Sequence, residues 1–149
     1  MKQLLLTVVI ALLWGLSLSA QVRTKKYNKF YDRTEYFDAY GNLIGYSKYN
    51  DFYDRTEYFD AHGNLQKTQE RNDFYDRDET RNAQGKIEST QEYNKFYDRY
   101  ETKDTRGNLK SYRQWNDFYD RWDLFDARGN LIGYYEYNDF YDRWEFFRP

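Results

Sequence analysis

The stretch YNDFYDRTEYFDAHGNLQKTQE, residues 49–70, is one copy of a unit that recurs every 22 residues. Its motif, Asn-(Lys/Asp)-Phe-Tyr-Asp-Arg, occurs six times, and a glycine stands midway between successive motifs. A fixed period of this length is typical of repeat architectures, in which each unit buries its apolar face against its neighbours. The motifs begin at Asn28, Asn50, Asn72, Asn94, Asn116 and Asn138, and the glycines are Gly41, Gly63, Gly85, Gly107 and Gly129.

Each unit is predicted to fold as a β-hairpin. Residues 55–60 are rich in Thr, Tyr and Phe, which favour a pleated strand. The sequence from Asp60 to Asn64 then predicts a type I turn with a glycine bulge, because Asp opens such turns with its side chain and Gly63 can adopt a positive φ. Residues 65–70 return as a second strand, and the next motif makes the opposite connection. The chain is therefore expected to be an antiparallel meander of hairpins.

The two ends of the repeat region read as half-units. Residues 22–27 resemble a returning strand and residues 144–147 an outgoing one, which gives about twelve strands in one all-β domain over residues 21–149. A parallel β-helix is the rival, but it would stack like charges about 4.8 Å apart. An open twisted sheet or superhelix is the first expectation. A closed up-and-down barrel is the alternative, because pairing of the two half-units would remove both sheet edges.

The apolar positions that never change between units are predicted to form the core. They are the motif phenylalanines with the tyrosines that follow them, and the aliphatic residue after each Gly-Asn or equivalent pair. Strand positions that vary between apolar and charged residues cannot all be buried. The invariant residues are Phe30, Phe52, Phe74, Phe96, Phe118 and Phe140, and the aliphatic ones are Leu43, Leu65, Ile87, Leu109 and Leu131.

The invariant Asp-Arg pairs, such as Asp32/Arg33 and Asp54/Arg55, are interpreted as architectural. Asp can accept hydrogen bonds from backbone N–H groups in the turn, and Arg can bind a carboxylate through two nitrogens. An acidic residue always stands two places beyond the Arg, as Glu57 does after Arg55. Because residues two apart share one face of a strand, a same-face ion pair or a cross-strand ion pair is expected.

The first twenty residues differ from the repeat and predict a secretory signal peptide. Lys2 precedes an apolar run over residues 4–16, and small residues lead to a cleavage site after Ala20. The run is short for a membrane-spanning helix, which needs about 20 residues, so no transmembrane segment is expected after cleavage. The predicted location is secreted, periplasmic or at the cell surface.

Stability must come from the repeat itself, because the chain has no cysteine for disulfides.

Composition argues against several classes of function. A net charge of -2 offers no basic excess for phosphate contacts, so nucleic acid is not an expected partner. The chain has no cysteine, and its single histidine is His62, in a variable turn position. A His-based triad and a zinc site therefore lack their usual residues. The carboxylates repeat identically, whereas catalysis needs an asymmetric pair, and their spacing matches no standard calcium loop. No enzyme activity, metal or cofactor is predicted.

The unit YFDAYGNLI, residues 36–44, resembles the Tyr-Asp repeats of large bacterial surface and toxin-shell proteins. Trp122 before a glycine turn and Gly133-Tyr134 after it also resemble the aromatic hairpins of choline-binding repeats on bacterial cell walls. Both resemblances imply tandem hairpins on a bacterial exterior. Choline-binding repeats place a Gly-Trp pair at each hairpin end, however, whereas tryptophan here is restricted to a few units, and Tyr-Asp shells contain many more units. Neither resemblance assigns a ligand.

The units differ in a way that points to candidate binding residues. The middle units are polar at their free strand positions, whereas the first and last are aromatic. Either the two ends touch, or they bind something. The candidates for binding are Trp122, Tyr134, Tyr135 and Trp144, and packing of these residues between the two ends is the alternative. The predicted function is a binding module for glycan, another wall component or a surface protein. A scaffold that associates with itself or a partner by strand addition is the competing hypothesis.

Overall fold

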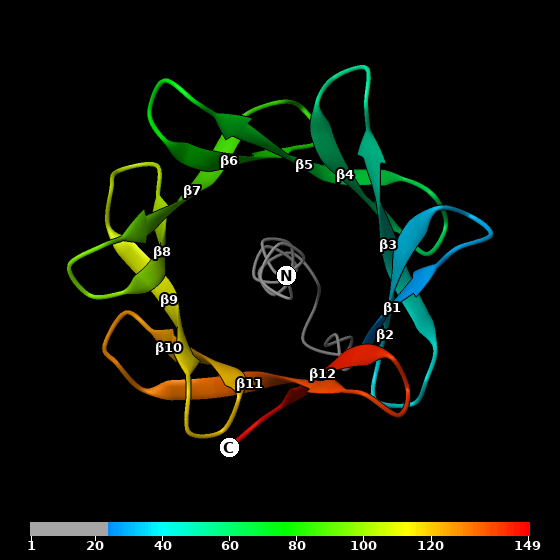
Figure 1. Cartoon of the computed structure of the whole chain (residues 1–149). Coiled ribbons are helices and arrows are strands. Elements are labelled where there is room, and N and C mark those ends of the chain that lie inside the picture. Colours follow the sequence, from blue (N-terminus) through cyan, green and yellow to red (C-terminus); the bar gives the residue numbers. More distant parts are fainter. Residues whose placement is uncertain (1–23) are drawn as a thin grey trace.

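The computed structural model describes residues 24–149, which form an all-β domain of twelve antiparallel strands (Figure 1). None of these residues forms a helix long and apolar enough to cross a membrane. The strands are β1 (Thr24–Asn28), β2 (Arg33–Phe37), β3 (Leu43–Asn50), β4 (Arg55–Asp60), β5 (Leu65–Asn72), β6 (Arg77–Asn82), β7 (Ile87–Asn94), β8 (Arg99–Asp104), β9 (Leu109–Asn116), β10 (Arg121–Asp126), β11 (Leu131–Asn138) and β12 (Arg143–Phe147). The predicted signal peptide lies outside the described residues.

The sheet closes on itself. Each strand pairs with the next one along the chain, and β1 also pairs with β12 through Thr24↔Glu145 and Lys25↔Trp144. The hairpin meander predicted from the sequence is confirmed, and of its two proposed forms the closed barrel is the one adopted, not the open sheet that was expected first. Closure is favoured because it pairs the backbone groups that two free edges would leave exposed.

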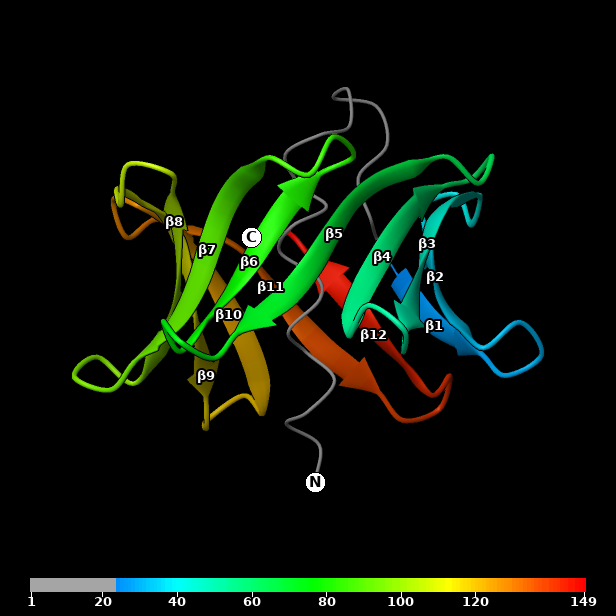
Figure 2. The same ribbon diagram turned by 90° about the horizontal axis from the view of Figure 1, so that it is seen from above.

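The two kinds of turn lie at opposite ends of the barrel (Figure 2). The Asn-(Lys/Asp)-Phe-Tyr-Asp-Arg motifs connect β1 to β2, β3 to β4 and so on, and the glycine turns make the alternate connections. One end therefore carries only motif turns and the other only glycine turns. We refer to them as the motif end and the glycine end.

The glycine turns have the predicted type I geometry with a bulge. In the turn from β4 to β5, Gly63 has φ 87° and its N–H donates to the carbonyl of Asp60 at 3.1 Å. The Asp60 carboxylate accepts from the amides of His62 and Asn64 at 2.9 and 2.8 Å. The strand register shifts next to the turn, between Tyr58 and Phe59. The Asp side chain thus stands in for a backbone acceptor and holds the turn shape.

The motif turns depend on an aspartate in the left-handed conformation. Asn50 opens the turn by accepting from the amides of Phe52 and Tyr53 at 3.1 and 3.2 Å. Asp54 then has φ 50°, and all six motif aspartates lie between 50° and 52°. Asp tolerates this region better than most residues with a side chain. Its carboxylate also accepts a hydrogen bond from the Tyr49 hydroxyl. The motif Asp thus shapes its turn, but its carboxylate accepts from a tyrosine hydroxyl, and the predicted hydrogen bonds from backbone N–H groups go to the Asn instead.

The motif phenylalanines are not core residues, and that prediction is wrong. Each is 86–87% exposed: Phe30, Phe52, Phe74, Phe96, Phe118 and Phe140. They lie in the turns, beyond the last paired residues of the strands, so their side chains cannot reach the interior. The tyrosines beside them are also exposed. The aliphatic residues after the glycine turns are half-buried, which fits their predicted packing role only in part.

The barrel interior is lined by residues that differ from unit to unit. Tyr36 and Tyr58 form one buried cluster, and Leu124, Tyr135 and Phe146 form another. Between these clusters the buried positions are mostly polar: Lys25, Ser47, Lys67, Thr80, Gln91, Ser111 and Arg113. The interior positions thus vary from unit to unit, whereas the turn positions repeat.

Candidate functional site

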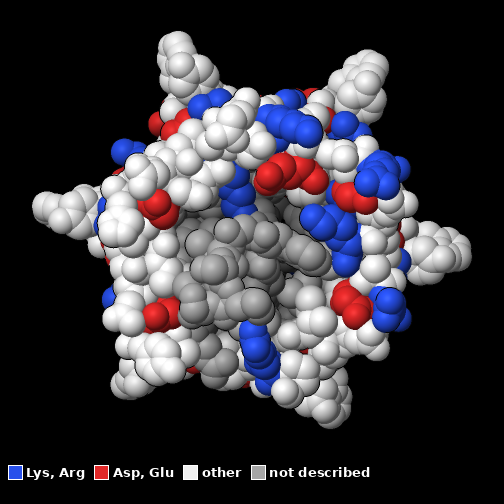
Figure 3. Space-filling view, turned by 180° about the vertical axis from the view of Figure 1, so that it is seen from behind, with Lys and Arg blue, Asp and Glu red and all other residues white. Residues whose placement is uncertain are grey.

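The most distinctive surface is a ring of Phe-Tyr pairs at the motif end, which we call the aromatic crown. Its phenylalanines are 86–87% exposed and its tyrosines 53–58%. Uncharged side chains project around the periphery of the barrel, outside its charged wall (Figure 3). Single exposed apolar residues are ordinary on a protein surface, but six equivalent Phe-Tyr pairs at one end of the barrel make this surface the candidate for an interaction. The pairs are Phe30/Tyr31, Phe52/Tyr53, Phe74/Tyr75, Phe96/Tyr97, Phe118/Tyr119 and Phe140/Tyr141.

The rings of the crown are held in one geometry. Phe52 and Tyr53 meet edge to face, with ring centroids 4.8 Å apart and planes at 89°, and the other pairs repeat this within 0.1 Å and 5°. The guanidinium carbon of Arg55 lies 4.5 Å from the Tyr53 ring centroid. The tyrosine is therefore covered on one face, and the phenylalanine is the ring with the greater free area. Such pairing limits the conformational freedom that a ligand would have to remove.

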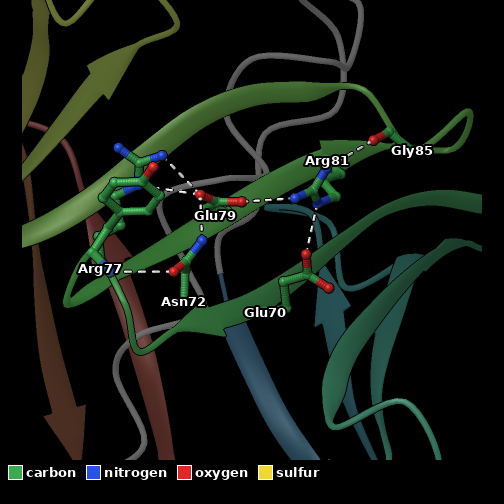
Figure 4. A network of polar contacts seen from close by, with 7 residues as sticks. Glu70, Asn72, Arg77, Glu79, Arg81 and Gly85 are labelled. Atoms are coloured by element: carbon green, nitrogen blue, oxygen red, sulfur yellow. Dashed lines mark hydrogen bonds and ion pairs between the residues drawn. The ribbon is translucent and has the colours of Figure 1, made fainter.

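A carboxylate fixes each motif arginine. Arg55 donates from Nε and NH2 to Glu57 Oε1 at 3.0 and 2.6 Å, and Asn50 donates to the same oxygen at 3.2 Å. Of the two predicted forms of ion pair, the same-face pair within one strand is observed here. Its most buried example is Glu79, whose pKa is lowered chiefly by the hydrogen bond from Arg77, with a further contribution from Asn72 (Figure 4). These hydrogen bonds with the carboxylate fix the position of the arginine that stacks on each crown tyrosine.

The four predicted binding residues do not share one surface. Tyr135 is buried in the interior, and Trp122 and Trp144 pack against its cluster. Tyr134 lies on the outer face, where it stacks on Phe147 with centroids 5.2 Å apart. Trp144 also lies beside Lys25, with its ring 5.9 Å from the ammonium nitrogen. That contact crosses the junction of β1 and β12. Trp144 therefore packs between the two ends of the repeat region, which is the predicted alternative to a role in binding.

Buried cations are the second unusual feature of the interior. Burial lowers the pKa of Lys25 to about 7, with a smaller effect from the charge of Arg113. Burial also lowers the pKa of Lys67 to about 7. Because Arg113 on β9 acts on Lys25 on β1 and on Tyr135 on β11, these side chains face a common interior. Neither lysine has an ion-pair partner among residues 24–149.

The motif and glycine turns do not gather metal ligands. No group of three or more His, Cys, Asp or Glu residues with a suitable arrangement occurs in the part of the chain that the structure describes. His62 is exposed in its turn. The carboxylates of the motif strands are instead bound to arginine, as in the pair Arg33–Glu35 at 2.6 Å.

The sequence does not point to the crown, because it predicts the motif phenylalanines as core residues. A signal for it was present: each Phe stands between the Asn that opens a turn and the Asp that ends it, and turn residues usually lie on the surface. An invariant apolar residue inside such a turn indicates an exposed anchor better than a core position.

Comparison with known proteins supports the fold alone. No protein-family model matches the sequence, and no curated protein matches it. A protein from Arabidopsis thaliana with a solved X-ray structure is similar, with a TM-score of 0.64 at 13% sequence identity, over 86% of this chain and 80% of that one. An identity this low carries no information on ligand or activity.

Proposed function

We propose that this protein is a non-enzymatic binding module of the cell exterior that recognises a glycan polymer of the envelope through the aromatic crown. The observation that carries the proposal is the repetition of one exposed Phe-Tyr pair, with the phenylalanine 86–87% exposed, in all six motif turns. Export rests on the predicted signal peptide.

A repetitive ligand fits a repetitive surface. Flat aromatic faces contact the C–H faces of sugar rings, and the neighbouring tyrosine hydroxyl supplies a polar group. One exposed ring binds weakly, but several equal sites on one rigid body gain avidity on a polymer that presents many copies of the same unit, by factors of about 10²–10⁴. A small ligand that binds at one place needs only one specialised site, so six equal sites favour a repetitive ligand.

Self-association through the crown is the second candidate function. It is favoured by the apolar character of the phenylalanine ring, since exposed apolar surface is normally covered by a partner. Association by strand addition has less support, because β1 and β12 pair with each other and leave no free sheet edge within residues 24–149 for an added strand. A scaffold would therefore have to use its side-chain surface.

The test is binding of residues 21–149 to insoluble cell-wall polysaccharide and to a glycan array. Phe→Ser is introduced in two, four and six motifs, and the proposal expects a graded loss of binding with unchanged circular dichroism. Tyr40→Ser is the matched control, because Tyr40 is 90% exposed but lies at the glycine end. Unchanged binding in the six-fold variant would refute the proposal. Absent glycan binding, together with oligomers that the six-fold variant abolishes, would establish the second candidate.

A further inference from the structure

A cavity of about 320 Å³ opens at the strands β6, β7 and β8, where a ring found in other units is missing. Its lining includes Arg77, Ile87, Thr90, Lys103 and Gly107. It lies apart from the crown phenylalanines, none of which lines it. Its volume is at the lower end of the range of small-molecule sites, about 300–1,000 Å³.

Three other units place a tyrosine where this unit has Thr90. Tyr46, Tyr112 and Tyr134 occupy the equivalent position, 22 or 44 residues away. Their rings lie 4.2, 4.0 and 3.7 Å from the guanidinium carbons of Arg33, Arg99 and Arg121, respectively. Each of these arginines also contacts its crown tyrosine, at 4.5–4.6 Å. In these units the arginine is therefore sandwiched between two aromatic rings.

The same tyrosines make two further contacts that define the space they fill. Each stacks on a phenylalanine of the next strand, as Tyr112 does on Phe125 with centroids 4.9 Å apart. The Tyr112 hydroxyl lies 3.6 Å from where a Cβ of Gly129 would be, and the Tyr46 hydroxyl has the same relation to Gly63 at 3.5 Å. The tyrosine side chain thus spans from the arginine to the glycine turn.

Arg77 has only half of this arrangement. Tyr75 covers one side at 4.5 Å, but Thr90 is too short to cover the other. Lys103 replaces the stacking phenylalanine and pairs with Glu92. No atom lies within 4 Å of the Cβ position of Gly107. The cavity therefore runs from Arg77 to Gly107, along the path of the missing tyrosine.

The remaining unit with a threonine at this position is closed differently. Thr68 is buried, and Arg81 extends across the site to bind Glu70 and Glu79, both at 2.7 Å, and the carbonyl of Gly85 at 3.2 Å (Figure 4). Lys103 is the equivalent of Arg81 and pairs with the corresponding carboxylates, Glu92 and Glu101, the latter at 3.6 Å. Unlike the Arg81 guanidinium, its single nitrogen has no hydrogen bond to the carbonyl of the following turn glycine among residues 24–149. The vacancy above Arg77 thus follows from two substitutions, Tyr to Thr and Phe to Lys.

We propose that this cavity binds a phenol-type aromatic ring, which stacks on Arg77 and directs its hydroxyl toward Gly107. The ring takes the place that tyrosine holds in the three filled units, and stacking on a guanidinium face is a favourable contact for it. Since the nearby Lys103 is paired with Glu92, a neutral ring meets no uncompensated charge from that side. The ring can belong to a small phenolic molecule or to a tyrosine side chain of a partner protein.

The test is an NMR titration of residues 21–149 with N-acetyl-tyrosinamide, with N-acetyl-leucinamide as the apolar control. We expect saturable shifts of the Ile87 methyl and Arg77 Nε–H signals with the first probe and at least tenfold weaker effects with the second. Thr90→Tyr builds the ring into the site and should abolish the response. Absence of saturable shifts, equal response to both probes, or an unchanged response in a folded Thr90→Tyr variant would each overturn the proposal.

The reverse substitution gives a second test that does not depend on the folding of Thr90→Tyr. Tyr112→Thr combined with Phe125→Lys recreates the vacancy above Arg99, and a second set of saturable shifts should then arise at Leu109 and Arg99. Failure of this folded variant to gain that site would contradict the proposal. The probe-free spectrum tests one source of the ring. Shifts at Ile87 that depend on protein concentration and are displaced by the probe indicate the tyrosine of a second copy, and their absence excludes a second copy as the source.

Discussion

Truncation of a crown phenylalanine should leave the barrel almost as stable as before. Phe74 is 87% exposed, and its ring contacts Tyr75 edge to face at 4.8 Å. Full burial of a phenylalanine side chain is worth about 1.5–3 kcal/mol, so the small buried part contributes about 0.2–0.4 kcal/mol. An aromatic pair adds about 0.5 kcal/mol at the low end of its range. We therefore expect Phe74→Ala to lower the free energy of unfolding by less than about 1 kcal/mol.

An interior tyrosine supplies the contrast. Tyr58 is fully buried, and its hydroxyl donates to Gln69 at 3.0 Å. Tyr58→Ala should lower the free energy of unfolding by about 3–5 kcal/mol, as large-to-small changes of buried aromatic residues do. Urea unfolding of both variants, followed by tyrosine fluorescence and far-ultraviolet circular dichroism, measures the difference. A loss of 3 kcal/mol or more for Phe74→Ala would show that the motif phenylalanines are buried and would refute this assignment of the two faces.

Two further predictions concern the interior lysines and the motif turn. Burial lowers the pKa of Lys25 and Lys67 to about 7. Above that pH the unfolded chain therefore binds more protons than the folded one. The free energy of unfolding should then rise from pH 7 to 9, by up to about 1.4 kcal/mol per pH unit for each lysine. Urea unfolding at several pH values should show a smaller slope for Lys25→Met, and a slope that is flat or falls in the wild type would contradict the burial of these cations. Asp54→Ala should cost about 1–2 kcal/mol, because alanine is strained at φ 50° and cannot accept the Tyr49 hydrogen bond. Asp54→Asn should lose less in thermal melting, and equal losses for the two variants would argue against a left-handed position.

The hairpins could be predicted from the sequence because their turn chemistry is local. Asp60 and Gly63 fix the glycine turn within five residues, and the half-units at the two ends correspond to the observed β1 and β12. Closure could not be decided in the same way. It depends on the pairing of Thr24 with Glu145, at opposite ends of the repeat region, and on the accumulated twist and register of all strands between them.

The two candidate sites differ in how far sequence reasoning could reach them. Invariance does not distinguish a core residue from a surface residue, since a repeat preserves whatever each unit uses. The prediction of Phe74 as a core residue fails for that reason. Comparison of units does reveal that Thr68 and Thr90 interrupt a series of tyrosines. The consequence at Thr90 could not be predicted, because the stacking of Tyr112 on Arg99 depends on the register of β8 against β9, which shifts beside the glycine turn.

A disulfide across the junction of β1 and β12 tests the central structural claim most directly. The chain has no cysteine, so Thr24→Cys with Glu145→Cys adds a single pair at facing positions of the register. Two cysteines can be bridged only when their Cα atoms are within about 7 Å. The closed barrel predicts that mild oxidation consumes both thiols within one molecule, giving a monomer with altered mobility under non-reducing electrophoresis. Thiols that stay free, or that form only bridges between molecules, would show that the ends do not meet and that the sheet is open.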